Sequence, residues 1–116
     1  MGGTTRFGTV FDLLGDNYTR EILRVTSTEP KGVKEMSREL DVARSTIYRR
    51  VNRLVDLGFL HEQTKTSLDG HHYTVYEAAI ERLTIEIENG ELGCQLHPSD
   101  DAASRFTKLM EGMSDI

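Results

Sequence analysis

Apolar side chains that recur every three or four residues in the first part of the chain predict helices over residues 5–14, 18–26 and 34–40. The first of these ends near Gly15 and the second ends before Pro30, because glycine and proline interrupt helices. Asp16 or Asn17 can cap the start of the second helix with a side-chain oxygen.

A further helix is predicted to begin near Ala43 and to end near Gly58. Advancing about 100° per residue places Ile47, Val51 and Leu54 on one stripe, which suits a helix that faces a core. The rest of its surface is polar and basic. The face opposite the stripe carries Ser45, Arg49, Asn52 and Arg53, with Thr46 and Tyr48 at its edges and Arg44 and Arg50 along its flanks.

The charge of this helix stands out from the rest of the chain. Four arginines fall within residues 44–53, and no acidic residue lies between Asp41 and Asp56, in a protein of formal net charge −5. Guanidinium groups, an amide and hydroxyls on one face can neutralise phosphates and hydrogen-bond to base edges in a DNA major groove. A basic helix face that is solvated and binds nothing is the alternative interpretation.

The elements around the basic helix favour the first interpretation. Residues 41–43 separate it from the helix predicted before it, and three residues suit the tight turn of a helix-turn-helix. Asp41 can adopt the left-handed backbone conformation there. Alternating residues then predict strands over 59–64 and 72–76, with a turn at Asp69-Gly70. A β-hairpin is thus expected directly after the basic helix.

A second hairpin is predicted around Asn89-Gly90, a pair that favours the type I′ turn. Apolar and polar residues alternate on both sides of it, between residues 80 and 96. Ser99 can then cap a last helix. The apolar stripe of that helix consists of Ala103, Phe106, Met110 and Met113.

Length and composition fit one globular domain: 116 residues, of which 37% are hydrophobic. No apolar run approaches the ~20 residues of a membrane span and no secretory signal is recognisable, so we expect a cytoplasmic protein. Cys94 is the only cysteine, which excludes a disulfide within the chain. Residues 1–53 hold 10 basic and 7 acidic residues, whereas residues 77–116 hold 3 and 9, so the first half is better suited to a polyanionic partner.

The chain resembles the winged helix-turn-helix of transcription regulators, particularly the ArsR-like group common in halophilic archaea. Three stretches carry the resemblance: FDLLGD at residues 11–16, VKEMSREL at residues 33–40, and STIYRRVNRL at residues 45–54 followed by Gly58-Phe59-Leu60. The resemblance implies an α+β fold. A winged helix-turn-helix DNA-binding domain would span residues 1–78, and an additional C-terminal β-hairpin and a C-terminal dimerisation helix, in residues 79–116, would complete the same compact domain.

By this resemblance the basic helix enters the major groove of double-stranded DNA and the first hairpin is the wing. The implied DNA-binding residues are Arg44, Ser45, Thr46, Tyr48, Arg49, Arg50, Asn52, Arg53 and, on the wing, Lys65. Three positions depart from the usual motif: Ser37 replaces alanine, Asp41 replaces glycine, and Ala43 replaces the serine or threonine that caps the recognition helix. Ser45 is a candidate to supply the missing cap.

We expect a homodimer on a pseudo-palindromic operator, because a two-fold dimer places two recognition helices about 34 Å apart on successive turns of DNA. The first and last predicted helices are the expected interface, and packing within one chain is the alternative. The expected interface residues are Phe7, Phe11, Phe106, Leu109, Met110 and Met113.

Two other functions are compatible with the sequence. Cys94 and His97 suggest a metal- or redox-responsive sensor, although structural metal sites normally supply four ligands. A winged-helix adaptor that binds protein has no need of the arginine-rich face. No catalytic constellation, metal site or cofactor motif is recognisable, so we do not expect an enzyme.

Arginine outnumbers lysine ten to four beside an acidic balance, a composition typical of halophiles. Because salt weakens phosphate contacts, we expect a regulator working at high salt to hold inorganic cations between its acidic surface and the DNA phosphates.

Overall fold

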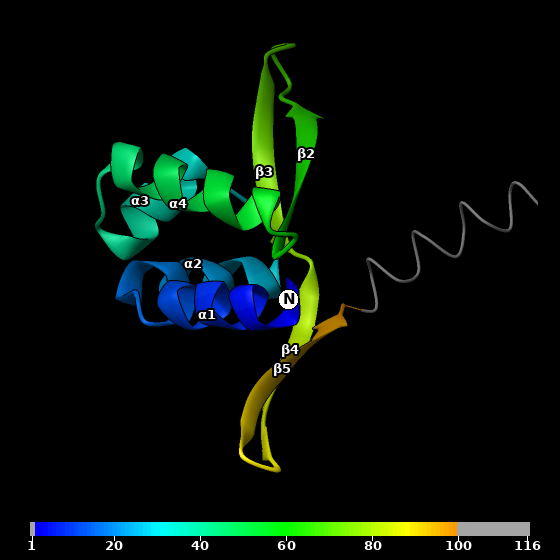
Figure 1. Cartoon of the computed structure of the whole chain (residues 1–116). Helices are drawn as coiled ribbons and strands as arrows, with labels where there is room; N and C mark the ends of the chain where they lie inside the picture. Colours follow the sequence, from blue (N-terminus) through cyan, green and yellow to red (C-terminus); the bar gives the residue numbers. More distant parts are fainter. Residues whose placement is uncertain (1, 100–116) are drawn as a thin grey trace, which may run out of the picture. The chain divides into compact units, whose positions relative to one another are not determined.

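The computed structural model describes the backbone of residues 2–99 and the side chains from Gly8 onward (Figure 1). The chain divides into two compact units, residues 1–78 and 79–116. The first unit contains, in order, α1 (Gly2–Leu14), α2 (Asn17–Thr28), β1 (Lys31–Gly32), α3 (Val33–Leu40), α4 (Arg44–Asp56), β2 (Leu60–Thr66) and β3 (His72–Ala78). The described part of the second unit contains β4 (Ile80–Glu88) and β5 (Glu91–Pro98).

The core of the first unit lies between the helices and the inner face of the β2–β3 hairpin (Figure 1). Helix α2 contacts α1, α4 and β3, and α4 contacts α3 and β2. As predicted, Ile47, Val51 and Leu54 of α4 are fully buried. They pack with apolar residues of the other elements, including Ile22, Val25, Met36, Phe59, Leu60 and Val75.

Helix α1 begins earlier than expected. Val10 and Leu13 are buried among its described side chains. Phe11, one of the expected interface residues, is 42% exposed. The side chain of Phe7 lies outside the described residues.

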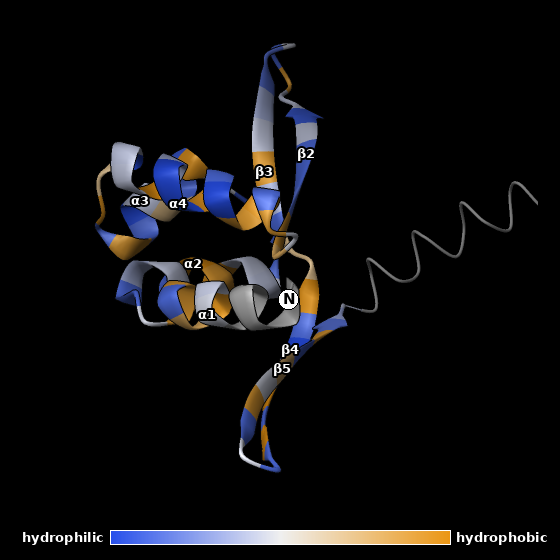
Figure 2. Cartoon of the chain, viewed as in Figure 1, coloured by the Kyte–Doolittle hydropathy of each residue, from blue (hydrophilic) through white to orange (hydrophobic). Residues whose placement is uncertain are grey.

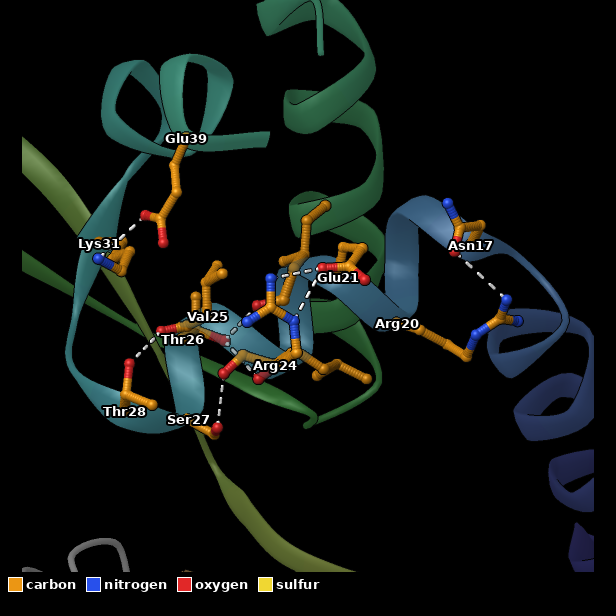
Figure 3. Close-up of polar contacts among 12 residues, drawn as sticks. Asn17, Arg20, Glu21, Arg24, Val25, Thr26, Ser27, Thr28, Lys31 and Glu39 are labelled. Carbon is orange, nitrogen blue, oxygen red and sulfur yellow. Dashed lines mark hydrogen bonds and ion pairs between the residues drawn. The ribbon is translucent and has the colours of Figure 1, made fainter. Parts of the chain in front are cut away.

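Helix α2 satisfies its hydroxyl groups locally, which allows a threonine-rich helix to pack in the core. Thr26 is fully buried, and its hydroxyl donates to the carbonyl of Ile22 at 2.7 Å (Figure 3). Thr28 donates in the same way to the carbonyl of Val25 at 2.9 Å. A buried hydroxyl that donates to a carbonyl of the preceding turn has a hydrogen-bond partner. Its burial therefore does not cost the free energy of an unsatisfied polar group.

Strand β1 was not predicted, because two residues are too few to show a period. It pairs antiparallel with β3, which also pairs with β2, giving the order β1-β3-β2. Lys31 of β1 is buried, with its ammonium 3.0 Å from a carboxylate oxygen of Glu29 and 3.1 Å from one of Glu39 (Figure 3). Hydrogen bonds to Glu29 and then Glu39 raise the pKa of Lys31.

The turn between α3 and α4 explains two of the departures from the usual motif. Asp41 has φ 55°, the left-handed conformation that the sequence led us to expect. The Ser37 hydroxyl donates to the carbonyl of Val42 at 2.6 Å, while the Val42 amide donates to the Ser37 carbonyl at 3.1 Å. Serine therefore closes the turn from a position where alanine is usual.

The two ends of α4 are stabilised differently. No side chain caps its start at Ala43, so the suggestion that Ser45 supplies the cap was wrong. Its end is a Schellman motif: the amide of Phe59 donates to the carbonyl of Leu54 at 2.8 Å, and that of Gly58 to Val55 at 3.0 Å. Gly58 has φ 83°, which glycine adopts at the least cost. The predicted helix end is confirmed.

In the second unit, β4 and β5 form an antiparallel pair joined by Asn89 and Gly90, both at positive φ as a type I′ turn requires. Apolar residues alternate with polar ones along both strands (Figure 2). The predicted last helix lies outside the described residues. Within residues 2–99, no helix is long and apolar enough to cross a membrane.

Candidate nucleic-acid interface

The outward face of α4 gathers most of the residues that the sequence singled out. Its opposite stripe is fixed in the core, so the helix cannot rotate without exposing Ile47, Val51 and Leu54. Thr46 is half-buried at the edge of the face. The exposed members are Arg44, Ser45, Tyr48, Arg49, Asn52 and Arg53.

Three of the arginines on α4 are free to meet an anion. Among the described residues, the guanidinium groups of Arg44, Arg49 and Arg53 have no ion-pair or hydrogen-bond partner. Asn52 lies between Arg49 and Arg53 on the same face and is also exposed. The face thus combines uncompensated positive charge with an amide that can both donate and accept hydrogen bonds.

Arg50 is placed differently from the other arginines of α4, on the flank that faces α2. Its Nε lies 2.6 Å from one carboxylate oxygen of Asp16 and its Nη2 lies 3.1 Å from the other. Its guanidinium carbon also sits 5.1 Å from the centre of the Tyr18 ring. The side chain is only 22% exposed. Arg50 therefore joins α4 to the start of α2.

Asp16 has two roles in this contact. Its carboxylate accepts hydrogen bonds from the amide and the hydroxyl of Thr19, both at 2.8 Å, and so caps α2 as the sequence suggested. It also holds Arg50. The hydrogen bond from Arg50 lowers the pKa of Asp16 far below its usual range, against the opposing effect of burial. The Asp16 carboxylate thus caps α2 and also binds α4, the helix that carries the basic face.

The wing contributes little positive charge. Lys65 of β2 is exposed, and no described residue forms an ion pair with it. Asp69 accepts a hydrogen bond from Ser67 and lies 3.0 Å from the Nδ1 atom of His71. The hydrogen bond from Ser67 is the largest cause of the lowered pKa of Asp69. Leu68 is fully exposed beside them, a feature that the sequence did not signal.

The first unit also has a cleft of about 540 Å³ that the sequence did not predict. It is bounded by the start of α3, by Tyr48 of α4 and by β3. Two exposed cations, Lys34 and Arg38, lie along it. Their spacing of one helical turn was visible in the sequence, but nothing there indicated that β3 would lie opposite.

The geometry of β4 and β5 argues against a metal site shared by Cys94 and His97. In the register of the hairpin, Cys94 lies opposite Ile85 and His97 opposite Arg82, so the two side chains are on opposite faces. The Nε2 atom of His97 is 3.0 Å from the hydroxyl of Thr84. No group of three or more potential ligand side chains gathers in the part of the chain that the structure describes.

Comparison with known families agrees with the arrangement of α2, α3 and α4. A family model described as a helix-turn-helix domain matches residues 14–63, from the end of α1 to the middle of β2. No curated protein matches the chain. Helix-turn-helix domains bind DNA in transcription regulators by inserting their second helix into the major groove. Residues 14–63 are therefore similar to the helix-turn-helix domains that DNA-binding regulators carry.

Proposed function

We propose that the protein is a sequence-specific transcription regulator that binds double-stranded DNA as a homodimer on a pseudo-palindromic operator. The observation that carries the proposal is the exposed face of α4, with Arg49 and Arg53 free of partners among the described residues and the opposite stripe held in the core. A helix anchored in this way presents a fixed pattern of donors to the groove.

Each residue on this face has a role that its chemistry suits. Arg49 and Arg53 can form bidentate hydrogen bonds with guanine, and Asn52 can do so with adenine. Arg44 lies at the positive end of the helix, where a phosphate is favoured. Ser45, Thr46 and Tyr48 supply hydroxyls at the edges of the face. Lys65 would contact the backbone beside the groove, as the wing does in this class of fold.

The dimer completes the recognition. One α4 reads only a few base pairs, whereas two of them, about 34 Å apart, read a two-fold symmetric site. Phe11 of α1 is 42% exposed, which suits an interface residue. The other proposed interface residues, Phe7, Phe106, Leu109, Met110 and Met113, lie outside the described side chains.

Selection of bound sequences from a random DNA pool tests this function. We expect enrichment of two inverted half-sites about one helical turn apart, together with a mass for the complex that corresponds to two chains. A single asymmetric half-site bound by one chain would contradict the dimer. Absence of any enriched sequence would contradict DNA recognition and favour the protein-binding adaptor.

The relation to the ArsR-like group of halophilic archaea is part of the same proposal. Its support is the excess of arginine over lysine and the acidic C-terminal residues. We propose that cations held between this acidic surface and the DNA phosphates sustain binding at high salt. Operator affinity measured against potassium chloride checks this, since the usual steep loss of affinity continuing into molar salt would contradict it.

A further inference from the structure

The cleft beside the wing combines features that a basic surface alone does not have. Its walls come from three elements: the first turns of α3, Tyr48 on α4, and β3. The side chains that matter here are Lys34, Arg38, Tyr48, Tyr73 and Tyr76. At about 540 Å³ the cleft is large enough for a phosphate group and the sugar or ring attached to it.

The α3 side of the cleft is electropositive. Lys34 and Arg38 lie one turn apart, are exposed, and have no ion-pair partner among the described residues. Gly32, the residue before α3, has no side chain that could cap the amides of the first turn. Helix N-termini with free amides attract anions. Glu35, the acidic residue of this wall, accepts a hydrogen bond from the backbone amide of Gly32 at 3.3 Å.

The β3 side supplies a buried donor without a partner. Tyr76 is 4% exposed and lines the cleft, yet its hydroxyl forms no hydrogen bond with any described residue. The residue is buried, but its hydroxyl oxygen keeps some accessible surface, and Tyr76 lines the cleft. Burial, with smaller contributions from Glu62 and Tyr48, raises the pKa of Tyr76, and the hydroxyl keeps its proton at neutral pH.

We propose that this cleft binds a phosphate ester through the first turn of α3, Lys34, Arg38 and the Tyr76 hydroxyl. Tyr48 and Tyr73 are about half exposed on its other walls and can pack against the sugar or ring that the phosphate carries. Two sources have this chemistry: a backbone phosphate of the bound DNA, in which case the site rests on the proposed function, and a free phosphorylated small molecule, which would compete with DNA for the cleft.

Amide NMR of the full chain tests the free-ligand source without DNA. The probes are inorganic phosphate and adenosine 5′-monophosphate, with adenosine as the uncharged control. The site predicts shifts of the amides of Val33, Lys34 and Glu35 with either phosphate probe and not with adenosine. These shifts should be lost in Lys34→Ala/Arg38→Ala. Shifts spread over α4 instead would overturn the site.

Affinity for the selected operator tests the DNA source. Tyr76→Phe removes only the hydroxyl, and we expect about tenfold weaker binding, as for one hydrogen bond to a charged group. Lys34→Ala/Arg38→Ala should weaken binding to all sequences alike and make the salt dependence shallower by about two phosphate contacts. A methylphosphonate replaces one charged backbone phosphate of the operator with a neutral group. At the position that contacts the cleft, and at no other, this replacement should make the variants bind as well as the unmodified protein.

The outcomes separate the two proposals. Thermal unfolding of Tyr76→Phe establishes that the variant is folded, and Lys34→Ala/Arg38→Ala changes only exposed residues. Arg24→Ala, an exposed arginine on α2, is the control for removal of positive charge. Normal operator binding by both variants together with no phosphate-induced amide shifts would overturn the cleft and leave the proposed function standing. Phosphate-induced amide shifts in a chain that binds no DNA would support the cleft and contradict the proposed function.

Discussion

Arg49 and Arg50 are neighbours on α4, yet they belong to two different regions of the molecule. Arg49 is exposed and free of partners among the described residues, as is Arg53 one turn later. Arg50 makes two hydrogen bonds to Asp16 and lies over Tyr18. Successive residues of a helix turn by about 100°, so only one of two adjacent side chains meets α2. The charge of an arginine therefore does not by itself make it a candidate for DNA contact. The candidate is the arginine that no other side chain of the protein binds.

The basic face and the α2-facing flank of α4 should therefore respond oppositely to mutation. Removal of charge from the basic face should weaken DNA binding and leave folding unchanged. Disruption of the flank should destabilise the first unit and affect DNA binding only through the placement of α4.

The largest effect is expected from Arg49→Ala/Arg53→Ala. Each bidentate contact to a base is worth about 1–3 kcal/mol, so operator affinity should fall by about 3 kcal/mol or more, roughly a hundredfold. Fluorescence anisotropy with the selected operator measures it, with Arg24→Ala as the control. Affinity within a factor of two of the unmodified protein would remove both residues from the interface.

Asp16→Ala should give the next largest effect, on stability. It removes the α2 cap, at a cost of about 1 kcal/mol, and leaves Arg50 without its partner, for a total of about 2–3 kcal/mol. Urea unfolding measures the free energy of unfolding. Glu21→Ala is the matched control, because Glu21 holds only the exposed Arg24. If Asp16→Ala and Arg50→Ala prove additive in the double variant, the two side chains are not coupled.

The same contact predicts how stability depends on pH. The pKa of Asp16 is lowered in the folded chain, so this carboxylate stabilises the fold above the ordinary aspartate pKa of about 3.9. This contribution decreases as pH falls below that value and is lost once the pH passes through the lowered pKa of the folded state. Unfolding free energies measured between pH 6 and pH 3 should fall less steeply for Asp16→Asn. Parallel curves would contradict the assignment.

Ser37→Ala, which restores the residue more usual in the motif, should destabilise the chain by about 1 kcal/mol. The Ser37 hydroxyl closes the turn between α3 and α4 through Val42, and alanine leaves that carbonyl without this donor. Thermal unfolding checks the change. A gain in stability would mean that the hydroxyl contributes nothing to the turn.

Lys65→Ala should give the smallest effect, about threefold in operator affinity, as for one exposed charge pair. The lysine is isolated on the wing, with Asp69 as the nearby acidic residue of the tip. A fall as large as that of the double arginine variant would show that the wing, rather than α4, dominates binding.

Periodicity located most of the fold because each long element repeats its pattern over several turns or pairs. The buried stripe of α4, its end at Gly58 and the left-handed Asp41 were all predictable from residue type and spacing. Strand β1 was not, because Lys31 and Gly32 carry no alternation and pair with a strand more than forty residues away. A Cβ on Gly32 would lie 3.3 Å from the Thr74 carbonyl, a close approach that becomes visible only in three dimensions.

The two hairpins make the same point. Both show alternation, but Leu60, Val75 and Tyr76 of β2 and β3 are buried. Along β4 and β5, Ile85, Ile87 and Leu92 are exposed, with 79% of Ile87 accessible. Alternation fixes which side chains share a face, and only the neighbouring elements fix whether that face is buried.

By itself, the sequence determined the helix-turn-helix and the outward, basic character of α4, because local spacing sets which side chains share a face. Only the tertiary structure decided that Asp16 takes Arg50 out of the exposed set and that β3 turns Lys34, Arg38 and Tyr76 into one cleft. The reason is physical: partners 34 or more residues apart meet through packing, and no local pattern records which charges that packing brings together.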